Sequence, residues 1–352
     1  MKIIEYKGKK YETTYDFPIL DKEKLEYLRK EYYKKPLFED VQKEFVCISK
    51  GGSKNTNITN YYVRDLMDKT LNSKTKWSIE DVMQNDELLS LFWYRTTLNK
   101  KVFLDTDSVR RKIDTIFRIG AMGLVSRPSN FPIKVVDEIL KKYNINNNYY
   151  DFSCGWGARL TSALKNKVNY FGTDPNYLLT EKLQQLAKDY KETLNQNTIV
   201  DIRTHGSEEF IPEWENKIGV AFSSPPYFDL EDYKIGNQSY KEGTTYRDWL
   251  NYYLEPTIKN IYKYLVDDGV FLINIKNFND YKLVDDVFNI SKKVGFNFIE
   301  TIPLKLCKKS NIKEKSGFSG IDEQIYVFFK NNKINILNDE QLTIFDYEEI
   351  GG

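Results

Sequence analysis

Histidine and cysteine are scarce in this sequence. Among 352 residues there is one histidine, His205, and the three cysteines, Cys47, Cys154 and Cys307, are scattered along the chain. No two of them have the spacing of metal ligands, which argues against a structural zinc site. The same scarcity argues against a cysteine–histidine nucleophile pair and a serine–histidine–aspartate triad. We interpret His205 as a polar residue beside a strand end.

Long apolar runs are absent as well. The sequence has no apolar run of about twenty residues, and its start has no apolar signal core. We therefore expect a soluble protein of the cytoplasm. The formal net charge is +1, so the whole chain is no polycation. Residues 1–125 carry 24 Lys and Arg against 19 Asp and Glu, a balance of +5, which leaves −4 for the remainder. The positive balance of residues 1–125 mildly favours a polyanionic partner.

Short apolar runs alternate with helical patterns from about Phe131 onward. Such alternation predicts an α/β fold, with a seven-stranded, Rossmann-like and mostly parallel sheet and helices on both faces. The seven runs are residues 149–152, 168–173, 198–203, 219–224, 269–275, 296–302 and 323–329. Ligands of such a sheet bind at the carboxyl ends of its strands, so functional residues are expected there.

The chain divides into three predicted regions. Residues 1–125 contain several helical stretches joined by a polar, glycine-containing segment, which predicts a separate, mainly helical N-terminal domain. Residues 126–330 form the predicted α/β domain. Residues 331–352 are a polar tail.

Two of the predicted strand ends favour an adenosine-containing ligand. After the first strand, Gly155 and Gly157 stand two residues apart before a helix that starts near Ala158, a turn that brings backbone close to a ligand. Asp174 ends the next strand about 20 residues later, where a carboxylate can accept both hydroxyls of a ribose. A helix N-cap is the alternative role for Asp174.

The fourth strand end carries the most specific motif, Ser224, Pro225, Pro226 and Tyr227. Proline cannot donate to a sheet ladder, so the strand must stop before this motif. Serine followed by two prolines and an aromatic resembles the loop of the DNA amino-methyltransferases, which transfer a methyl group from S-adenosyl-L-methionine to an exocyclic base nitrogen. The resemblance implies a methyltransferase sheet and a bacterial or phage-encoded, nucleoid-associated enzyme.

The resemblance also implies which residues bind the cofactor. It extends over roughly residues 127–330 and includes the segment before the glycine loop. The family commonly has Gly-Asp beside the adenine, but Ser207 follows Gly206 in this chain, which is a departure from the pattern. The implied cofactor-binding residues are Phe131, Pro132, Asp151, Ser153, Gly155, Gly157, Asp174 and Ser207.

The residue types at this strand end suit methylation of an amino group. An exocyclic amine is a poor nucleophile because its lone pair is delocalised into the base, so it needs acceptors that hold its two N–H bonds. The Ser224 hydroxyl and the Pro225 carbonyl are such acceptors, and the two prolines keep that carbonyl fixed. Tyr227 offers a flat face to an extruded base, worth about 1–3 kcal/mol. No metal is required.

Serine at the first motif position favours cytosine N4 as the target, because the family pairs Asp or Asn there with adenine N6. Adenine N6 is the close alternative. An RNA amino-methyltransferase and a non-catalytic module that binds cofactor or nucleic acid are further alternatives. The residues do not distinguish a lone methylase from a member of a restriction-modification system or a phage self-protection enzyme.

Target recognition needs a second surface, because few residues separate the two loops or follow Lys330. We expect it in residues 1–125, together with the polar loop of residues 229–243. Arg110, Arg111, Arg118 and Arg127 are candidates for phosphate contacts, with exposed or ion-paired helix residues as the alternative. The substrate would be duplex DNA with the base extruded, or single-stranded DNA.

The tail contains a possible partner peptide. Gln341, Leu342, Ile344 and Phe345 lie in an acidic context and resemble the short peptides that dock bacterial proteins onto the replication sliding clamp. A last strand or a strip packed on the body is the alternative interpretation.

Overall fold

The computed structural model describes residues 2–13, 16–98, 116–117, 123–126, 128–234, 238–241, 243–304 and 324–330. The four arginines named as candidates for phosphate contacts lie outside these described residues, and so does the predicted partner peptide at residues 341–345. No helix among the described residues is long and apolar enough to cross a membrane.

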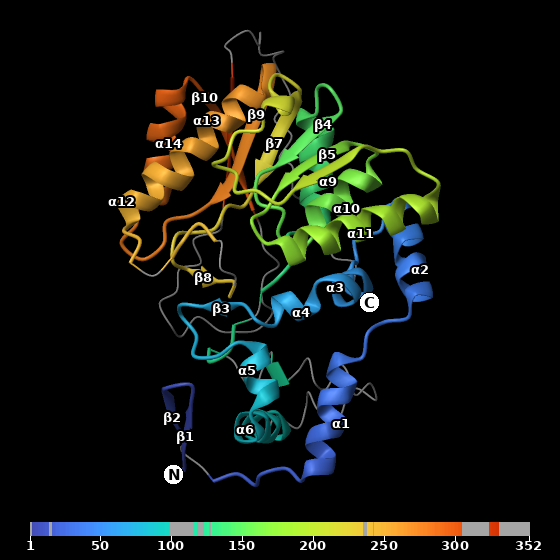
Figure 1. The fold of residues 1–352 in the computed structure, drawn as a ribbon, viewed down its shortest axis with the longest axis vertical. Coiled ribbons are helices and arrows are strands. Elements are labelled where there is room, and N and C mark those ends of the chain that lie inside the picture. Colours follow the sequence, from blue (N-terminus) through green and yellow to red (C-terminus); the bar gives the residue numbers. More distant parts are fainter. Residues whose placement is uncertain are drawn as a thin grey trace.

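The upper part of the molecule in Figure 1 contains a seven-stranded sheet, as predicted. Strands β7, β4, β5 and β6 run parallel to one another, and β9 runs parallel to β7. Strand β11 is antiparallel to both of its neighbours, β9 and β10. In spatial order the strands are β10 (Asn297–Pro303), β11 (Gln324–Phe329), β9 (Leu265–Ile275), β7 (Ile218–Ser223), β4 (Asn148–Asp151), β5 (Asn169–Thr173) and β6 (Val200–Arg203).

Helices cover both faces of the middle of this sheet. Successive side chains of a strand point to opposite faces, so a strand covered on both sides is buried at every position. Every residue of β7 is buried. Val220 and Phe222 belong to one apolar cluster and Ala221 to another. On the side of the first cluster lie α9 (Ile133–Tyr143), α10 (Ala158–Lys165) and α11 (Tyr177–Leu194). On the other lie α12 (Tyr246–Trp249), a π-helix η3 (Leu250–Leu254), α13 (Glu255–Tyr264) and α14 (Leu283–Val294).

The N-terminal region is mostly helical and begins with a β-hairpin. A third apolar cluster, which includes Leu28, Trp77 and Phe92, holds the hairpin against several of the helices. The elements are β1 (Lys2–Tyr6), β2 (Lys9–Thr13), α1 (Lys22–Tyr33), α2 (Phe38–Ser49), α3 (Thr56–Tyr62), α4 (Arg64–Met67), β3 (Leu71–Asn72), α5 (Ile79–Gln84) and α6 (Asp86–Thr97). Two further short elements, η2 (Pro212–Trp214) and β8 (Glu231–Asp232), lie between β6 and α12 in the chain.

Helices α2 to α4 pack on the sheet region rather than on the third cluster. The rings of Phe45 and Tyr190 meet edge to face with centroids 5.0 Å apart, and both residues belong to the cluster that covers the sheet. The Tyr62 hydroxyl donates to Asp189 over 2.6 Å. The N-terminal region is therefore joined to α11 through buried contacts, and the division of the chain at residue 125 stays a prediction.

Candidate active site

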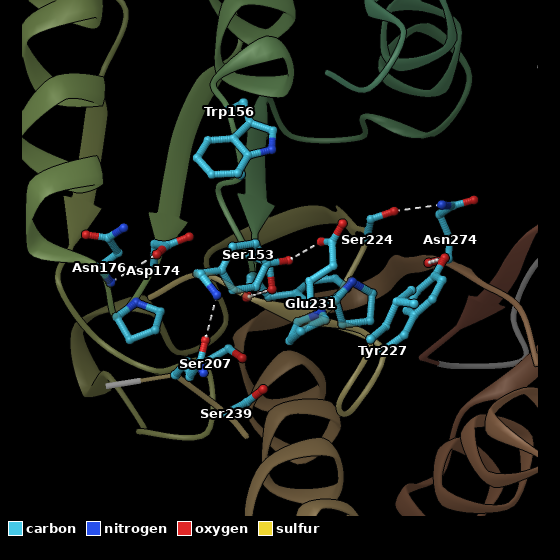
Figure 2. A pocket seen from close by; sticks show the side chains of 18 of the residues that line it. Ser153, Trp156, Asp174, Asn176, Ser207, Ser224, Tyr227, Glu231, Ser239 and Asn274 are labelled. Carbon is cyan, nitrogen blue, oxygen red and sulfur yellow. Dashed lines mark hydrogen bonds between the residues drawn. The ribbon is translucent and has the colours of Figure 1, made fainter. Parts of the chain in front are cut away.

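A cavity of about 370 Å³ opens at the carboxyl ends of the central strands (Figure 2). Ten of the twelve residues predicted from the sequence line it, and Asp151 and Gly157 do not. The ten are Phe131, Pro132, Ser153, Gly155, Asp174, Ser207, Ser224, Pro225, Pro226 and Tyr227. Six of the eight predicted cofactor residues thus share one cavity with the Ser-Pro-Pro-Tyr loop, residues 224–227.

The glycine loop between β4 and α10 needs glycine for two different reasons. Gly155 has φ 56° and Gly157 has φ 83°, a left-handed conformation that disfavours other residues. A Cβ on Gly157 would also lie 2.8 Å from Cδ2 of Leu183 in α11. Gly157 is the N-cap of α10, so it allows α10 and α11 to approach each other rather than lining the cavity.

Asp151 acts on the loop through a neighbour. It is fully buried and accepts from Nε of Arg159 at 2.9 Å and from the Tyr170 hydroxyl at 2.9 Å. Arg159 also donates to the carbonyl oxygen of Ser153 and lines the cavity. The Asp151–Arg159 ion pair therefore fixes the backbone of the glycine loop through the bond from Arg159 to the Ser153 carbonyl. Sequence reasoning missed Arg159, whose only signal is its place in the first turn after the loop.

Asp174 lies at the end of β5 and faces the same cavity. Its carboxylate accepts the backbone N–H of Asn176 at 3.0 Å. Burial raises the pKa of Asp174 to about 7, although that N–H opposes the rise. The N-cap of α11 is Asn176, whose side chain accepts from the Leu179 N–H. Helix capping therefore does not account for Asp174.

A tyrosine from the π-helix, Tyr253, also lines the cavity. Its hydroxyl lies 3.5 Å from Oγ of Ser153, and the residue is almost fully buried. A π-helix adds one residue to a helical turn and is frequent at functional sites. Ser207, beside it, is held by Thr257 at 2.8 Å and through its carbonyl by Asn260 at 3.0 Å. Nothing in the sequence pattern signalled Tyr253.

The Ser-Pro-Pro-Tyr loop is held at both ends by one residue of β9, Asn274. The Asn274 side-chain amide donates to Oγ of Ser224 at 2.7 Å, and its backbone carbonyl accepts from the Tyr227 hydroxyl at 3.3 Å. Tyr227 is therefore anchored by its hydroxyl, while its ring lines the cavity. Phe228 follows with φ 52°, a left-handed conformation that reverses the chain after the loop.

The next segment forms the remaining wall of the cavity. Glu231 lines the same cavity as Ser224 (Figure 2) and accepts from the Tyr233 hydroxyl at 2.7 Å. Burial raises the pKa of Tyr233 well above its ordinary value, so this phenol stays protonated and donates. The Tyr233 ring approaches Trp156 of the glycine loop, with centroids 6.2 Å apart. Part of the polar loop predicted for recognition, residues 229–243, thus lines the cavity.

The cavity is lined by hydroxyls, carbonyls, carboxylates, side-chain amides, aromatic rings and the guanidinium of Arg159. No group of three or more His, Cys, Asp or Glu side chains within the described residues could hold a metal ion. His205 lies outside the cavity lining, with Nδ1 3.0 Å from a Glu209 carboxylate oxygen.

Comparison with protein families agrees with this arrangement. Residues 218–350 match the family model described as DNA methylase. The match begins at β7 and contains the Ser-Pro-Pro-Tyr loop. It confirms the predicted resemblance to the S-adenosylmethionine-dependent amino-methyltransferases of DNA, and it supports S-adenosylmethionine as the cofactor and DNA as the substrate.

Solved structures match the chain at low similarity, and no curated protein matches it. A TehB-like methyltransferase from Corynebacterium glutamicum has 16% identity and a TM-score of 0.37, with 56% of this chain and 86% of that chain covered. A putative methyltransferase from Listeria monocytogenes has 12% identity and a TM-score of 0.37, with coverages of 57% and 99%. An O-methyltransferase from Thermotoga maritima has 12% identity and a TM-score of 0.36, with coverages of 59% and 69%.

Proposed function

We propose that this protein methylates cytosine N4 in DNA, with S-adenosylmethionine bound against the glycine loop and Asp174. The observation that carries the proposal is the single cavity shared by Asp174, the glycine loop, Ser224 and Pro225. A ribose diol needs a carboxylate acceptor, and a base amino group needs two oxygen acceptors. The cavity contains both sets of groups, so their chemistry fits a nucleoside cofactor and an amine substrate.

The residues of the loop would hold the amine for attack. The bound cofactor supplies a methyl group on a positively charged sulfur. The Pro225 carbonyl follows the end of β7 and accepts one N–H bond, and Ser224 Oγ accepts the other. Asn274 orients Ser224 by donating to the same oxygen. As the new N–C bond forms, the bond between the methyl carbon and sulfur would break and leave its electron pair on sulfur. The amine nitrogen would become positively charged, and its extra proton would leave to solvent.

The Tyr227 ring would stack on the extruded base. Because its hydroxyl is tied to β9, the ring is fixed before the base enters, which lowers the entropy lost on binding. Cytosine N4 remains preferred over adenine N6, because serine stands at the first motif position. The alternatives from the sequence, an RNA substrate or a non-catalytic binding role, are outcomes of the same assay.

Transfer of a tritiated methyl group to DNA, followed by digestion of the product to nucleosides, tests this proposal. We expect N4-methyldeoxycytidine. Tyr227→Ala should lower kcat/KM by about 5- to 150-fold, which corresponds to the loss of about 1–3 kcal/mol of base stacking. Ser224→Ala should lower kcat, because one acceptor for the amine is lost.

Tyr252→Ala is the matched control. Because Tyr252 is 75% exposed, its replacement should leave kcat/KM unchanged. N6-methyldeoxyadenosine as the sole product would refute the cytosine assignment. Methylation of RNA alone would refute DNA as the substrate. Full activity of both loop variants would refute the catalytic role of the loop.

Asp174 should make cofactor binding depend on pH. Its pKa of about 7 means that its carboxylate gains a proton as the pH falls from 8 to 6. The protonated form offers one acceptor fewer to a ribose diol, so the affinity for S-adenosylhomocysteine should fall about tenfold over this range. Titration calorimetry at several pH values measures the change.

Asp174→Asn is the control, because the amide has the same shape and does not titrate. Its affinity should be low and nearly independent of pH. An unchanged wild-type affinity between pH 6 and 8, or a variant with the wild-type pH dependence, would rule out this role of Asp174.

We propose in addition that Gln341, Leu342, Ile344 and Phe345 dock the protein onto the bacterial sliding clamp. The support is the spacing of the apolar residues in an acidic tail. Deletion of residues 338–352 should abolish clamp binding and leave methyl transfer to free DNA intact. A wild-type protein that does not bind the clamp, or a deletion variant that still does, would disprove this docking.

A further inference from the structure

The N-terminal region pairs with a segment that lines the active-site cavity. Strand β3 pairs with β8, so that Leu71 lies opposite Asp232 and Asn72 opposite Glu231. The Ser73 N–H donates to the carbonyl of Leu230 at 2.8 Å. Leu230 and Glu231 line the cavity. Figure 1 shows β3 and β8 side by side between the central sheet and the β1–β2 hairpin.

Lysines gather on the elements next to this pairing. Lys9 lies on β2, Lys74 and Lys76 on the turn after β3, and Lys234 two residues after β8. We call these four residues the lysine face. Nζ of Lys9 donates to the carbonyl of Lys76 at 2.5 Å, and Nζ of Lys76 donates to the carbonyl of Lys10. The hairpin and the turn after β3 are therefore tied together through two ammonium groups.

The positive charge of the lysine face is only partly neutralised. Lys234 pairs with Asp232, and the Lys74 ammonium lies over the Phe278 ring, 4.7 Å from its centroid. Within the part of the chain that the structure describes, Lys9 and Lys76 form no ion pair with a carboxylate. Burial lowers the pKa of Lys9, and repulsion from Lys234 and Lys76 lowers it further, although Asp81 opposes the shift. Like charges are thus held close together beside the cavity wall.

We infer that the lysine face binds the phosphates of the DNA strand that enters the cavity. This inference rests on the proposed function. A base that stacks on Tyr227 remains attached to phosphates on both sides, and these must lie near the cavity opening. Ammonium groups beside the β3–β8 pair, whose neighbours Leu230 and Tyr233 line the cavity, would offset the negative charge of the strand without reading its sequence. The face would hold the DNA while other groups choose the target.

The salt dependence of DNA binding tests this inference in the full-length protein. Each phosphate neutralised by lysine contributes about 0.9 to the slope of log Kd against log salt concentration. The triple variant Lys9→Gln, Lys76→Gln and Lys234→Gln should lower this slope by about two to three. It should also weaken binding of a short duplex about tenfold or more at a fixed salt concentration of about 100 mM. The measurement uses fluorescence anisotropy with S-adenosylhomocysteine present.

The matched control removes the same charge elsewhere. Lys141, Lys188 and Lys292 are exposed on α9, α11 and α14, and their replacement by Gln should leave the slope unchanged. Binding of S-adenosylhomocysteine confirms that each variant is folded. If the triple variant does not bind S-adenosylhomocysteine, the double variant Lys74→Gln and Lys234→Gln replaces it. The double variant keeps the Lys9 and Lys76 contacts and should lower the slope by about one to two.

An unchanged slope in the lysine-face variants, or an equal loss in the control, would overturn the inference. Methyl transfer by the wild type separates this failure from that of the proposed function. If the wild type methylates DNA and the slope is unchanged, only the lysine face is wrong. If the wild type neither binds nor methylates DNA, the proposed function and this inference both fail.

Discussion

The arrangement of the active-site cavity depends on one contact between neighbouring parallel strands. Ser223 at the end of β7 lies opposite Ile273 of β9, so Asn274 comes level with the Ser-Pro-Pro-Tyr loop. Asn274 then bonds to Ser224 with its side chain and to Tyr227 with its backbone. A loop that contains two prolines has few N–H groups of its own with which to fix itself. The neighbouring strand supplies that constraint, and the acceptor oxygens and the aromatic ring keep fixed positions as a result.

The other walls are held from outside the loop in a similar way. The buried pair of Asp151 and Arg159 fixes the glycine loop, and removal of either partner would leave an uncompensated charge in the interior. Strand β3 of the N-terminal region pairs with β8, which lies next to residues that line the cavity. It also contacts the segment before α9, where Asn130 donates to Thr59 at 2.5 Å. The N-terminal region thus contacts two segments that line the cavity, and we expect its removal to disturb the cavity wall.

The sequence predicted the sheet well because its strands are buried on both faces and therefore appear as short apolar runs. It also predicted the positions of Ser224 and Asp174, since both follow such runs directly. Asn274, Arg159 and Tyr253 were not predicted. Asn274 faces Ser224 only because two strands far apart in the chain are neighbours, and Tyr253 reaches the cavity from a π-helix, which has no sequence signature. Gly157 packs against Leu183 and does not line the cavity, and its contact with the cofactor stays a prediction.

The central claim is that one cavity holds the cofactor and the target amine. A crystal structure with S-adenosylhomocysteine and a short DNA tests it most directly. We predict that the ribose hydroxyls will bond to Asp174, with the sulfur directed toward Ser224 and the Pro225 carbonyl. An extruded base will then stack on Tyr227 with its amino group between these two acceptors. A cofactor bound away from Asp174, or a base held outside the Ser-Pro-Pro-Tyr loop, would contradict the account.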